Sequence, residues 1–213
     1  MPIAFLILLI SFSLPEYTRA QVPAASPDRA EFERSLADKD FRNRSKALAE
    51  LAPVKAAWKL EILKKSLEDE NPEISQRAAR LIARSGDPSA FQTLALALPA
   101  AGKQTRLGLL TAFGDLGDKR AVALLLPFLS EGDRQMRWKA AEVLGKLGSD
   151  TAVEPLRKAA AEDKDRSVRR AAVESLGGIG SPAARAALES LRSGGDAQTA
   201  LWAGNVLRSI GAE

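Results

Sequence analysis

The chain has 213 residues, a formal net charge of +4 and neither cysteine nor histidine. The two missing residue types exclude thiol nucleophiles, disulfides, Cys or His metal sites and any catalytic scheme that needs an imidazole, so only carboxylate or lysine chemistry remains. Basic and acidic residues are interspersed instead of forming a basic stripe, so we expect no nucleic-acid partner. Alanine and leucine dominate and aromatic residues make up only 5%, which predicts an all-α chain packed through small side chains.

The first segment is an uncharged apolar run, residues 3–14 (IAFLILLISFSL). A run of about a dozen residues is short for spanning a bilayer but suits the apolar part of a secretory signal. We therefore expect a signal peptide over residues 1–20, a flexible leader over 21–26 and a secreted or periplasmic repeat domain over 27–213, with no membrane span in the mature chain. Two alternatives stay open: an uncleaved segment that anchors the chain to a membrane, and a misread start.

Three helices are expected to begin with the same pattern, a capping residue followed by proline. The three pairs are Ser26-Pro27, Asp87-Pro88 and Ser181-Pro182. Ser and Asp side chains accept hydrogen bonds from the free N–H groups at a helix start, and proline costs nothing at the first helical position because an N–H there has no partner.

An apolar pattern repeats along the chain every 31 or 32 residues. Six anchor positions define it: Asn43, Ile74, Thr105, Met136, Val168 and Thr199. Four residues past the anchors stand Ala47, Ala78, Leu109, Ala140, Ala172 and Ala203, and eight past them stand Leu51, Ile82, Phe113, Leu144, Leu176 and Leu207. Because positions i, i+4 and i+8 share one face of a helix, these residues predict a buried stripe. Twelve past the anchors are glycines that favour a left-handed helix end: Gly86, Gly117, Gly148, Gly180 and Gly211.

A second apolar column lies eleven or twelve residues before the anchors and belongs to another helix of each repeat: Phe32, Leu63, Leu94, Leu125, Leu156 and Leu188. Two helices of about eleven residues with short turns fill such a period. Neither helix can bury its apolar stripe alone. We therefore predict about a dozen helices in six stacked pairs that form one elongated domain.

The segments MRWKAAEVLGKLG (136–148) and VRRAAVESLGGIG (168–180), preceded by helices such as TAVEPLRKAAAE (151–162), resemble the short HEAT-like repeat of the phycobilisome-lyase type. The resemblance extends over nearly all of residues 27–211. It implies an all-α fold, a right-handed α-solenoid of about six two-helix HEAT-like repeats. It says little about function, because the same repeat serves many unrelated roles.

In similar repeats, an Asp at the head of the second helix and an Arg in its first turn link adjacent units. The resemblance gives this structural role, helix capping plus inter-repeat ion pairs, to Asp40, Arg44, Arg106, Asp133, Arg137, Asp165, Arg169 and Asp196. Four positions depart from the pattern: Asn71 and Gly102 replace the Asp, while Ser75 and Ala200 replace the Arg. We therefore expect the second, third and last repeats to be tied less tightly.

Enzymes with similar repeats provide the catalytic alternatives. Deoxyhypusine hydroxylase-like proteins hold iron through His-Glu motifs, which a chain without histidine lacks. Bilin lyases and HEAT-like DNA glycosylases are compatible with the composition, but an exported chain without a basic groove suits neither. We expect no enzymatic activity, no catalytic residues, no cofactor and no metal site.

The resemblance also implies that the second helices line the concave face of the solenoid, where residues two and six past each anchor project away from the core. The partner-binding candidates on this face are Gln76, Arg80, Leu107, Thr111, Trp138, Glu142, Arg170, Glu174, Leu201 and Asn205. An apolar centre of Leu107 and Trp138 inside a polar rim is typical of protein interfaces. We predict a non-catalytic protein-binding scaffold or adaptor that binds a protein or peptide partner there. The alternative is a lyase-like or chaperone-like accessory protein that holds a small ligand in the same groove through Glu142 and Glu174.

Two tryptophans each have two interpretations. Trp138 is either a binding anchor or a ring that folds over its neighbours and shields the stack. Trp202, in the last helix, either seals the open end of a monomer or contacts a partner or a second copy of the chain.

Overall fold

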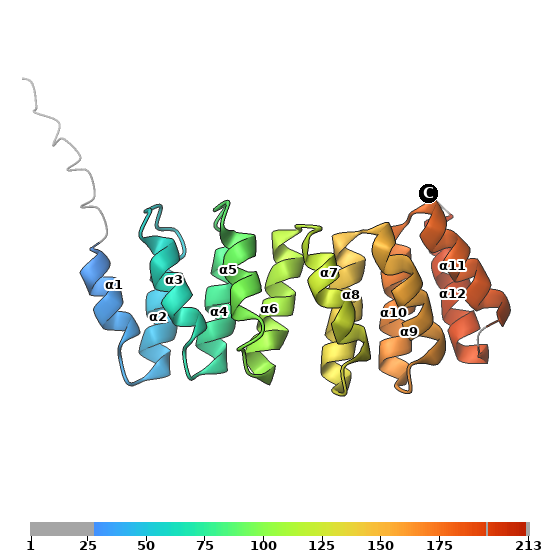
Figure 1. Cartoon of the computed structure of the whole chain (residues 1–213), viewed down its shortest axis with the longest axis horizontal. Helices are drawn as coiled ribbons and strands as arrows, with labels where there is room; N and C mark the ends of the chain where they lie inside the picture. Colours follow the sequence, from blue (N-terminus) through green and yellow to red (C-terminus); the bar gives the residue numbers. More distant parts are fainter. Residues whose placement is uncertain (1–27, 195, 212–213) are drawn as a thin grey trace, which may run out of the picture.

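The computed structural model describes residues 28–194 and 196–211, and within them it contains twelve α-helices and two short 3-10 helices (Figure 1). The expected signal peptide (1–20) and leader (21–26) lie outside the described residues, so export stays a prediction. Among the described helices, none is both long enough and apolar enough to cross a membrane. In chain order the elements are α1 (Arg29–Leu36), α2 (Phe41–Leu51), α3 (Lys59–Leu67), α4 (Pro72–Ala83), α5 (Ala90–Ala97), α6 (Lys103–Leu116), α7 (Ala121–Leu125), η1 (Leu126–Ser130), α8 (Arg134–Leu147), η2 (Asp150–Ala152), α9 (Val153–Glu162), α10 (Arg166–Ile179), α11 (Pro182–Gly194) and α12 (Ala197–Ile210).

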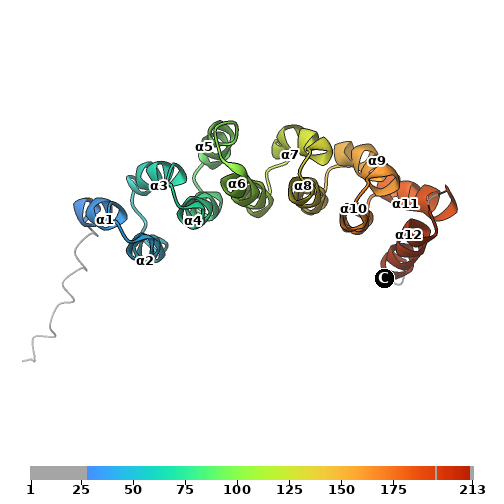
Figure 2. The ribbon, with the colours of Figure 1, turned by 90° about the horizontal axis from the view of Figure 1, so that it is seen from below.

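The helices form six pairs that stack into a curved rod. Each odd-numbered helix packs against the even-numbered helix that follows it, and each even-numbered helix packs against the even-numbered helix of the next pair. Figure 2 shows the even-numbered helices on the inner, concave side of the arc and the odd-numbered helices on its outer side. The predicted all-α solenoid of six two-helix repeats is therefore confirmed.

One apolar core runs through the stack between the two layers of helices. The residues four and eight past the anchors are buried in every repeat, as the period predicts. Four of the six anchor residues are also buried, but Asn43 is exposed and Thr105 is only half-buried. The second apolar column, eleven or twelve residues before the anchors, lies on the odd-numbered helices and is buried from Leu63 onward. In the first repeat Phe32 is half-buried, with its ring centroid 5.8 Å from that of Trp58, and α1 contains no fully buried residue.

Side-chain caps begin most of the even-numbered helices. The capping residues, each of which accepts a hydrogen bond from a backbone N–H of the first turn, are Asp40, Asn71, Asp133, Asp165 and Asp196. Glycine ends several helices as predicted, with positive φ angles at Gly86, Gly117, Gly148 and Gly180. The prediction is wrong at Gly211, whose φ is −99° and whose conformation is right-handed.

Two of the three predicted capping-residue and proline starts are wrong. The N-cap of α1 is Asp28, whose side chain accepts from the backbone N–H of Ala30, so this helix begins after Ser26-Pro27. Asp87 accepts from the backbone N–H of Ser89 in a turn, and α5 begins only at Ala90. The third start is correct, because α11 begins at Pro182 and the N–H of Ala184 donates to the Ser181 hydroxyl.

Candidate partner-binding surface

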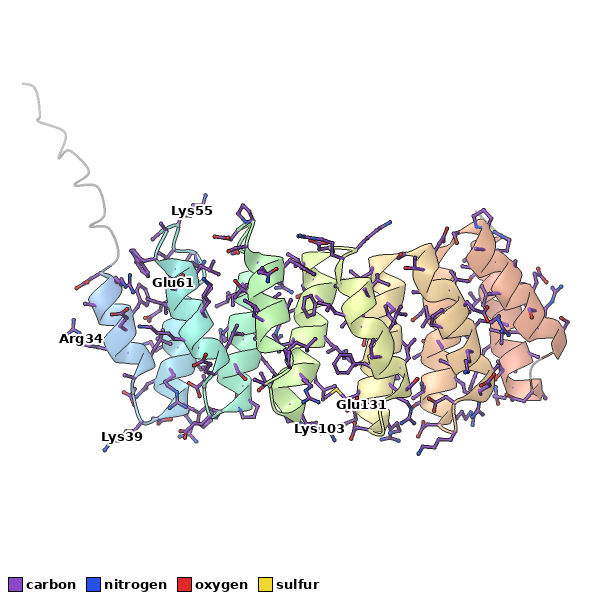
Figure 3. All side chains as sticks on the ribbon, in the orientation of Figure 1. Arg34, Lys39, Lys55, Glu61, Lys103 and Glu131 are labelled. Atoms are coloured by element: carbon purple, nitrogen blue, oxygen red, sulfur yellow. The ribbon has the colours of Figure 1, made fainter. Side chains whose placement is uncertain are left out.

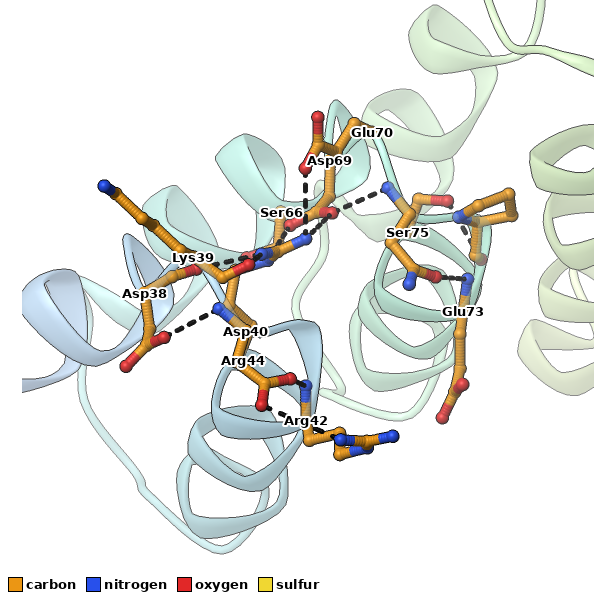
Figure 4. Close-up of polar contacts among 12 residues, drawn as sticks. Asp38, Lys39, Asp40, Arg42, Arg44, Ser66, Asp69, Glu70, Glu73 and Ser75 are labelled. Carbon is orange, nitrogen blue, oxygen red and sulfur yellow. Dashed lines mark hydrogen bonds and ion pairs between the residues drawn. The ribbon is translucent and has the colours of Figure 1, made fainter.

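Two buried arginines clamp neighbouring repeats together. The Arg44 Nε and Nη2 atoms each donate to a carboxylate oxygen of Asp69 at 2.8 Å, while its Nη1 donates to the carbonyls of Asp38 and Lys39 (Figure 4). The hydrogen bonds that Arg44 donates to Asp69 raise the pKa of Arg44, so the guanidinium stays charged. Each such arginine therefore joins the loop before its own helix to the following repeat.

Arg137 repeats this arrangement three repeats further along. Its Nε and Nη2 atoms donate to Asp163 at 2.7 and 3.1 Å, and its Nη1 donates to the carbonyls of Glu131 and Gly132. Side-chain exposure is only 6% for Arg137 and 7% for Asp163. A buried bidentate pair of this kind is costly to break, because removal of one partner leaves an uncompensated buried charge.

The acid that pairs with Arg44, Arg106 and Arg137 is a different residue from the capping residue, whereas Arg169 lies nearest the capping Asp196. Asp69, Glu131 and Asp163 stand two residues before the capping residue of their repeat, whereas Ala100 and Gly194 occupy this position in the third and last repeats. The capping Asp133 and Asp165 make weaker cross-repeat contacts of their own, to Lys103 at 2.6 Å and to Arg134 at 3.7 Å, both at partly exposed positions. Lys103 and Glu131 both lie at the edge of the rod where α6 and α8 begin (Figure 3).

The arginine clamp is weaker in other repeats. Arg106 lies 3.9 Å from Glu131, and Arg169 lies 3.7 Å from Asp196. The Nε atom of Arg169 is buried without a hydrogen-bond partner. Between the second and third repeats, the hydroxyls of Ser75 and Thr105 hydrogen-bond at 2.8 Å in place of an ion pair. The ties between repeats are therefore uneven along the rod.

The ten partner-binding candidates all lie on even-numbered helices, and all are exposed or half-buried. Trp138 and Leu201 are exposed to 39% and 56%, and they are two of the three exposed large apolar side chains in the part of the chain that the structure describes. Leu107 and Thr111 are half-buried, and the Thr111 hydroxyl donates to the Leu107 carbonyl at 2.9 Å.

Half of the candidates meet in one hollow, which we call the first hollow. It lies between α4, α6 and α8, has a volume of about 330 Å³, and is lined by the candidates Gln76, Arg80, Leu107, Thr111 and Trp138. Sequence reasoning missed four further residues of its wall, Gln104, Gly108, Gln135 and Lys139. They stand one residue before or three residues past their anchors, so these two positions of each repeat also reach the concave face.

Trp138 also borders a second hollow of about 330 Å³ between α8 and α10. The second hollow contains the candidates Glu142 and Glu174, together with Lys146, which the sequence analysis did not single out. The other three candidates, Arg170, Leu201 and Asn205, line neither hollow. Trp138 is thus the single residue that the two hollows share.

Glycines bring the concave helices close together beneath these hollows. A Cβ atom on Gly108 of α6 would lie 2.3 Å from the Cγ atom of Gln76 on α4, and one on Gly145 of α8 would lie 2.5 Å from the Cβ atom of Ser175 on α10. Such distances are far below van der Waals contact. The Ser175 hydroxyl then reaches across to donate to the Ala141 carbonyl at 2.8 Å. Helix backbone therefore forms part of the floor of each hollow.

Trp202 faces the preceding repeat and not the open end of the rod. The guanidinium carbon of Arg166, on α10, lies 5.4 Å from the centroid of its ring, and the Arg166 Nη2 atom donates to the Gln198 side chain at 2.8 Å. This ring position corrects the idea that Trp202 seals the end. The alternative, in which Trp202 contacts a partner or a second copy of the chain, stays a prediction.

Comparison with known proteins agrees with this architecture. The model of the HEAT repeats family matches residues 94–165 and 122–208, which together exceed half of the chain. A designed armadillo repeat protein in complex with the peptide (KR)4 has a TM-score of 0.54 and 17% identity, over 84% of this chain and 98% of that chain. A chain from a structure of microtubule plus-end tracking by XMAP215, CLIP-170 and EB1 has a TM-score of 0.58 and 16% identity, over 84% and 90%.

An engineered protein is also similar, with a TM-score of 0.53 and 20% identity over 85% of this chain and 96% of that chain. At these identities the likeness shows the fold alone. No curated protein matches the sequence. The family model, the 31-residue period and the stacked helix pairs agree, and the chain belongs to the HEAT repeat family.

Proposed function

We propose that this protein is a non-catalytic scaffold that binds a protein or peptide segment along the concave face of its solenoid. The exposed ring of Trp138 at the junction of the two hollows is the observation that supports this most. Tryptophan is the residue type that most often dominates binding energy, and a polar rim of the kind that surrounds it here excludes water from such an anchor. The fold shared with a designed armadillo protein in complex with a peptide leads to the same expectation.

The geometry of the two carboxylates argues against the small-ligand alternative. The side chains of Glu142 and Glu174 are 48% and 55% exposed, and each is paired with a cation of its own helix, Lys139 and Arg170, at 2.7 Å. A carboxylate pair that performs acid–base chemistry needs a site that positions it against a substrate and excludes water. The second hollow is instead an open depression suited to an extended chain.

The test is a display selection of random peptides on the purified protein, followed by affinity measurement on Trp138→Ala. We expect the selected peptides to bind this variant at least about 10-fold more weakly, because the ring provides the apolar centre of the surface. The melting temperature should change by no more than about 2 °C, because the exposed ring lies outside the buried core.

Leu201→Ala is the matched control, because Leu201 stands at the same position of the last repeat, is exposed and lines neither hollow. It should leave the peptide affinity unchanged. A large drop in melting temperature for Trp138→Ala with unchanged peptide binding would show that the ring shields the stack, and the proposal would be wrong.

A further inference from the structure

The two hollows carry opposite charge. The first hollow is lined by the cations Arg80 and Lys139, and no carboxylate is among its lining residues in the described part of the chain. The second hollow is lined by Glu142 and Glu174 against a single cation, Lys146. The sign of the charge therefore reverses across the ring of Trp138.

The charges of the first hollow are only partly neutralised by the protein itself. Arg80 is exposed and makes no ion pair with any described residue, so its guanidinium is free to pair with a ligand. Lys139 lies 4.7 Å from the centroid of the Trp138 ring and contacts Glu142 at 2.7 Å. Lys139 lines the first hollow while its ion-pair partner Glu142 lines the second, so Arg80 is the cation of the first hollow that is not neutralised by a described residue.

In the second hollow all three charged groups form ion pairs, but the cation pairs with a carboxylate that lies outside the hollow. Lys146 donates to Asp115 on the preceding repeat at 2.8 Å, which draws its charge away from the carboxylates. Glu174 retains 55% exposure beside Arg170, and Glu142 retains 48%. Glu142 accepts from Lys139 through Oε2 and Glu174 accepts from Arg170 through Oε1, so the second oxygen of each carboxylate remains available to a basic ligand group.

We infer that the concave groove selects a peptide with one acidic and one basic side chain flanking an apolar one, with the acidic side chain over the first hollow and the basic one over the second. The apolar side chain packs on Trp138. This inference rests on the proposed function and adds the charge order of the ligand to it. Electrostatic complementarity of this kind specifies the register of a bound chain and rejects ligands that place a like charge in either hollow.

The spacing of the three side chains follows from the spacing of the helices. Packed helices lie about 8–10 Å apart, so the centres of the two hollows are separated by roughly one and a half helix spacings, or about 13 Å. An extended peptide rises about 3.3 Å per residue and points every second side chain to the same face. The ligand pattern is therefore acidic, any, apolar, any, basic.

The experiment measures three fluorescently labelled peptides of the same length at low ionic strength. One contains Glu-Gly-Leu-Gly-Lys, one carries Glu at both charged positions, and one carries Lys at both. We expect the mixed peptide to bind the wild-type protein about fivefold or more tightly than either like-charged peptide. The preference should shrink as salt is added, because these sites are exposed.

Charge-reversal variants then assign each hollow. Arg80→Glu should switch the preference to the peptide with two lysines, and Glu174→Lys should switch it to the peptide with two glutamates. Lys46→Glu is the matched control, because Lys46 is exposed on α2 and lines neither hollow, and it should preserve the preference for the mixed peptide. Circular dichroism establishes that all three variants remain helical.

The outcomes separate this inference from the proposed function. Binding of all three peptides with equal affinity, each weakened by Trp138→Ala, overturns the charge order and leaves the scaffold function standing. Failure of every peptide, including those from the display selection, overturns both. Tighter binding of a labelled single-stranded oligonucleotide than of any peptide also overturns the inference, since its phosphates would be repelled by the second hollow.

Discussion

At the scale of single residues, the last repeat lacks the acidic residue that pairs with an arginine of the preceding repeat in the clamps of Arg44 and Arg137. The position of Asp69 and Asp163 is occupied by Gly194 in the last repeat, and the Nε atom of Arg169 is left buried without an acceptor. Unsatisfied buried donors of this kind cost about 1–3 kcal/mol. The clamp is therefore incomplete between the fifth and sixth pairs.

Gly194→Asp should complete the clamp and raise the melting temperature by roughly 2–4 °C, which corresponds to about 1 kcal/mol in a domain of this size. A Cβ atom at Gly194 meets no other atom within 4 Å, so the side chain has room. Gly194→Ala is the control that isolates the gain in helix propensity. The two variants melting at the same temperature would show that Arg169 gains nothing from the new carboxylate.

Asp115 is the residue whose ionisation should most clearly affect stability. The hydrogen bond from Lys146, followed by that from Arg84, lowers the pKa of Asp115, whose side chain is 12% exposed. Because the pKa is lower in the folded state, the stabilisation is complete above the unfolded pKa of about 3.9 and is lost as the pH falls through the folded value.

Asp115→Asn should therefore melt at a lower temperature than the wild type at pH 7, and the difference should narrow as the pH falls below about 4. Thermal melts monitored by circular dichroism at pH 7 and at pH values below 4 measure this. Asp150→Asn, at an exposed position, should show no comparable difference at neutral pH. If the difference in melting temperature between Asp115→Asn and the wild type stays constant with pH, the charge of Asp115 does not stabilise the fold.

At the scale of helices, close approach on the concave side depends on glycines that touch the next helix. Gly145→Ala should destabilise the protein by about 1–3 kcal/mol, because the new methyl group would lie 2.7 Å from the backbone Cα atom of Ser175. The loss should outweigh the gain in helix propensity, which is at most about 1 kcal/mol. Urea unfolding of the variant measures the net effect.

Gly178→Ala is the matched control, and its expected effect on the free energy of unfolding has the opposite sign. Gly178 is exposed on α10, and a Cβ atom there would lie no closer than 3.9 Å to its nearest neighbour. This substitution should stabilise the protein by about 0.5–1 kcal/mol through helix propensity alone. Stabilisation by both substitutions would mean that the α8–α10 contact can relax at little cost.

The helices themselves were predictable because their signal is local and repeated. A stripe at i, i+4 and i+8 and a glycine twelve residues past the anchor recur often enough to define six pairs without any structure. Single helix starts were less predictable, since Asp87 and Ser89 both suit a cap and the turn geometry chooses between them. The glycine pattern was wrong at Gly211, where the backbone is right-handed with a φ of −99°.

The contacts between repeats were harder to predict. The fourth and fifth repeats each offer the arginine of the preceding repeat two acids that are two residues apart. The path of the loop determines which acid the guanidinium reaches, as with Asp163 and Asp165 around Arg137. The concave surface was predicted at Trp138 because it projects from the core. Lys139 was missed because a position three past the anchor faces the neighbouring repeat and reaches solvent only at its tip.

At the scale of the whole molecule, the rod is a one-dimensional array. Interior pairs contact a neighbour on both sides and terminal pairs on only one, so local stability should decrease toward the ends. The N-terminal end should be the weakest, because α1 contains no fully buried residue. Native-state hydrogen exchange should therefore be slowest in α8 and α10 and fastest in α1. Uniform protection across all pairs would contradict this array behaviour.

The bridge from Arg84 through Asp115 to Lys146 also has a mechanical consequence. It connects three successive repeats along the inner edge, with both contacts at 2.8 Å. If the two ends of the rod are pulled apart, the inner edge must lengthen first, and this bridge makes the second to fourth repeats the stiffest part of that edge. Tension transmitted through a bound partner would then stretch the other repeats while the segment that carries Trp138 keeps its shape.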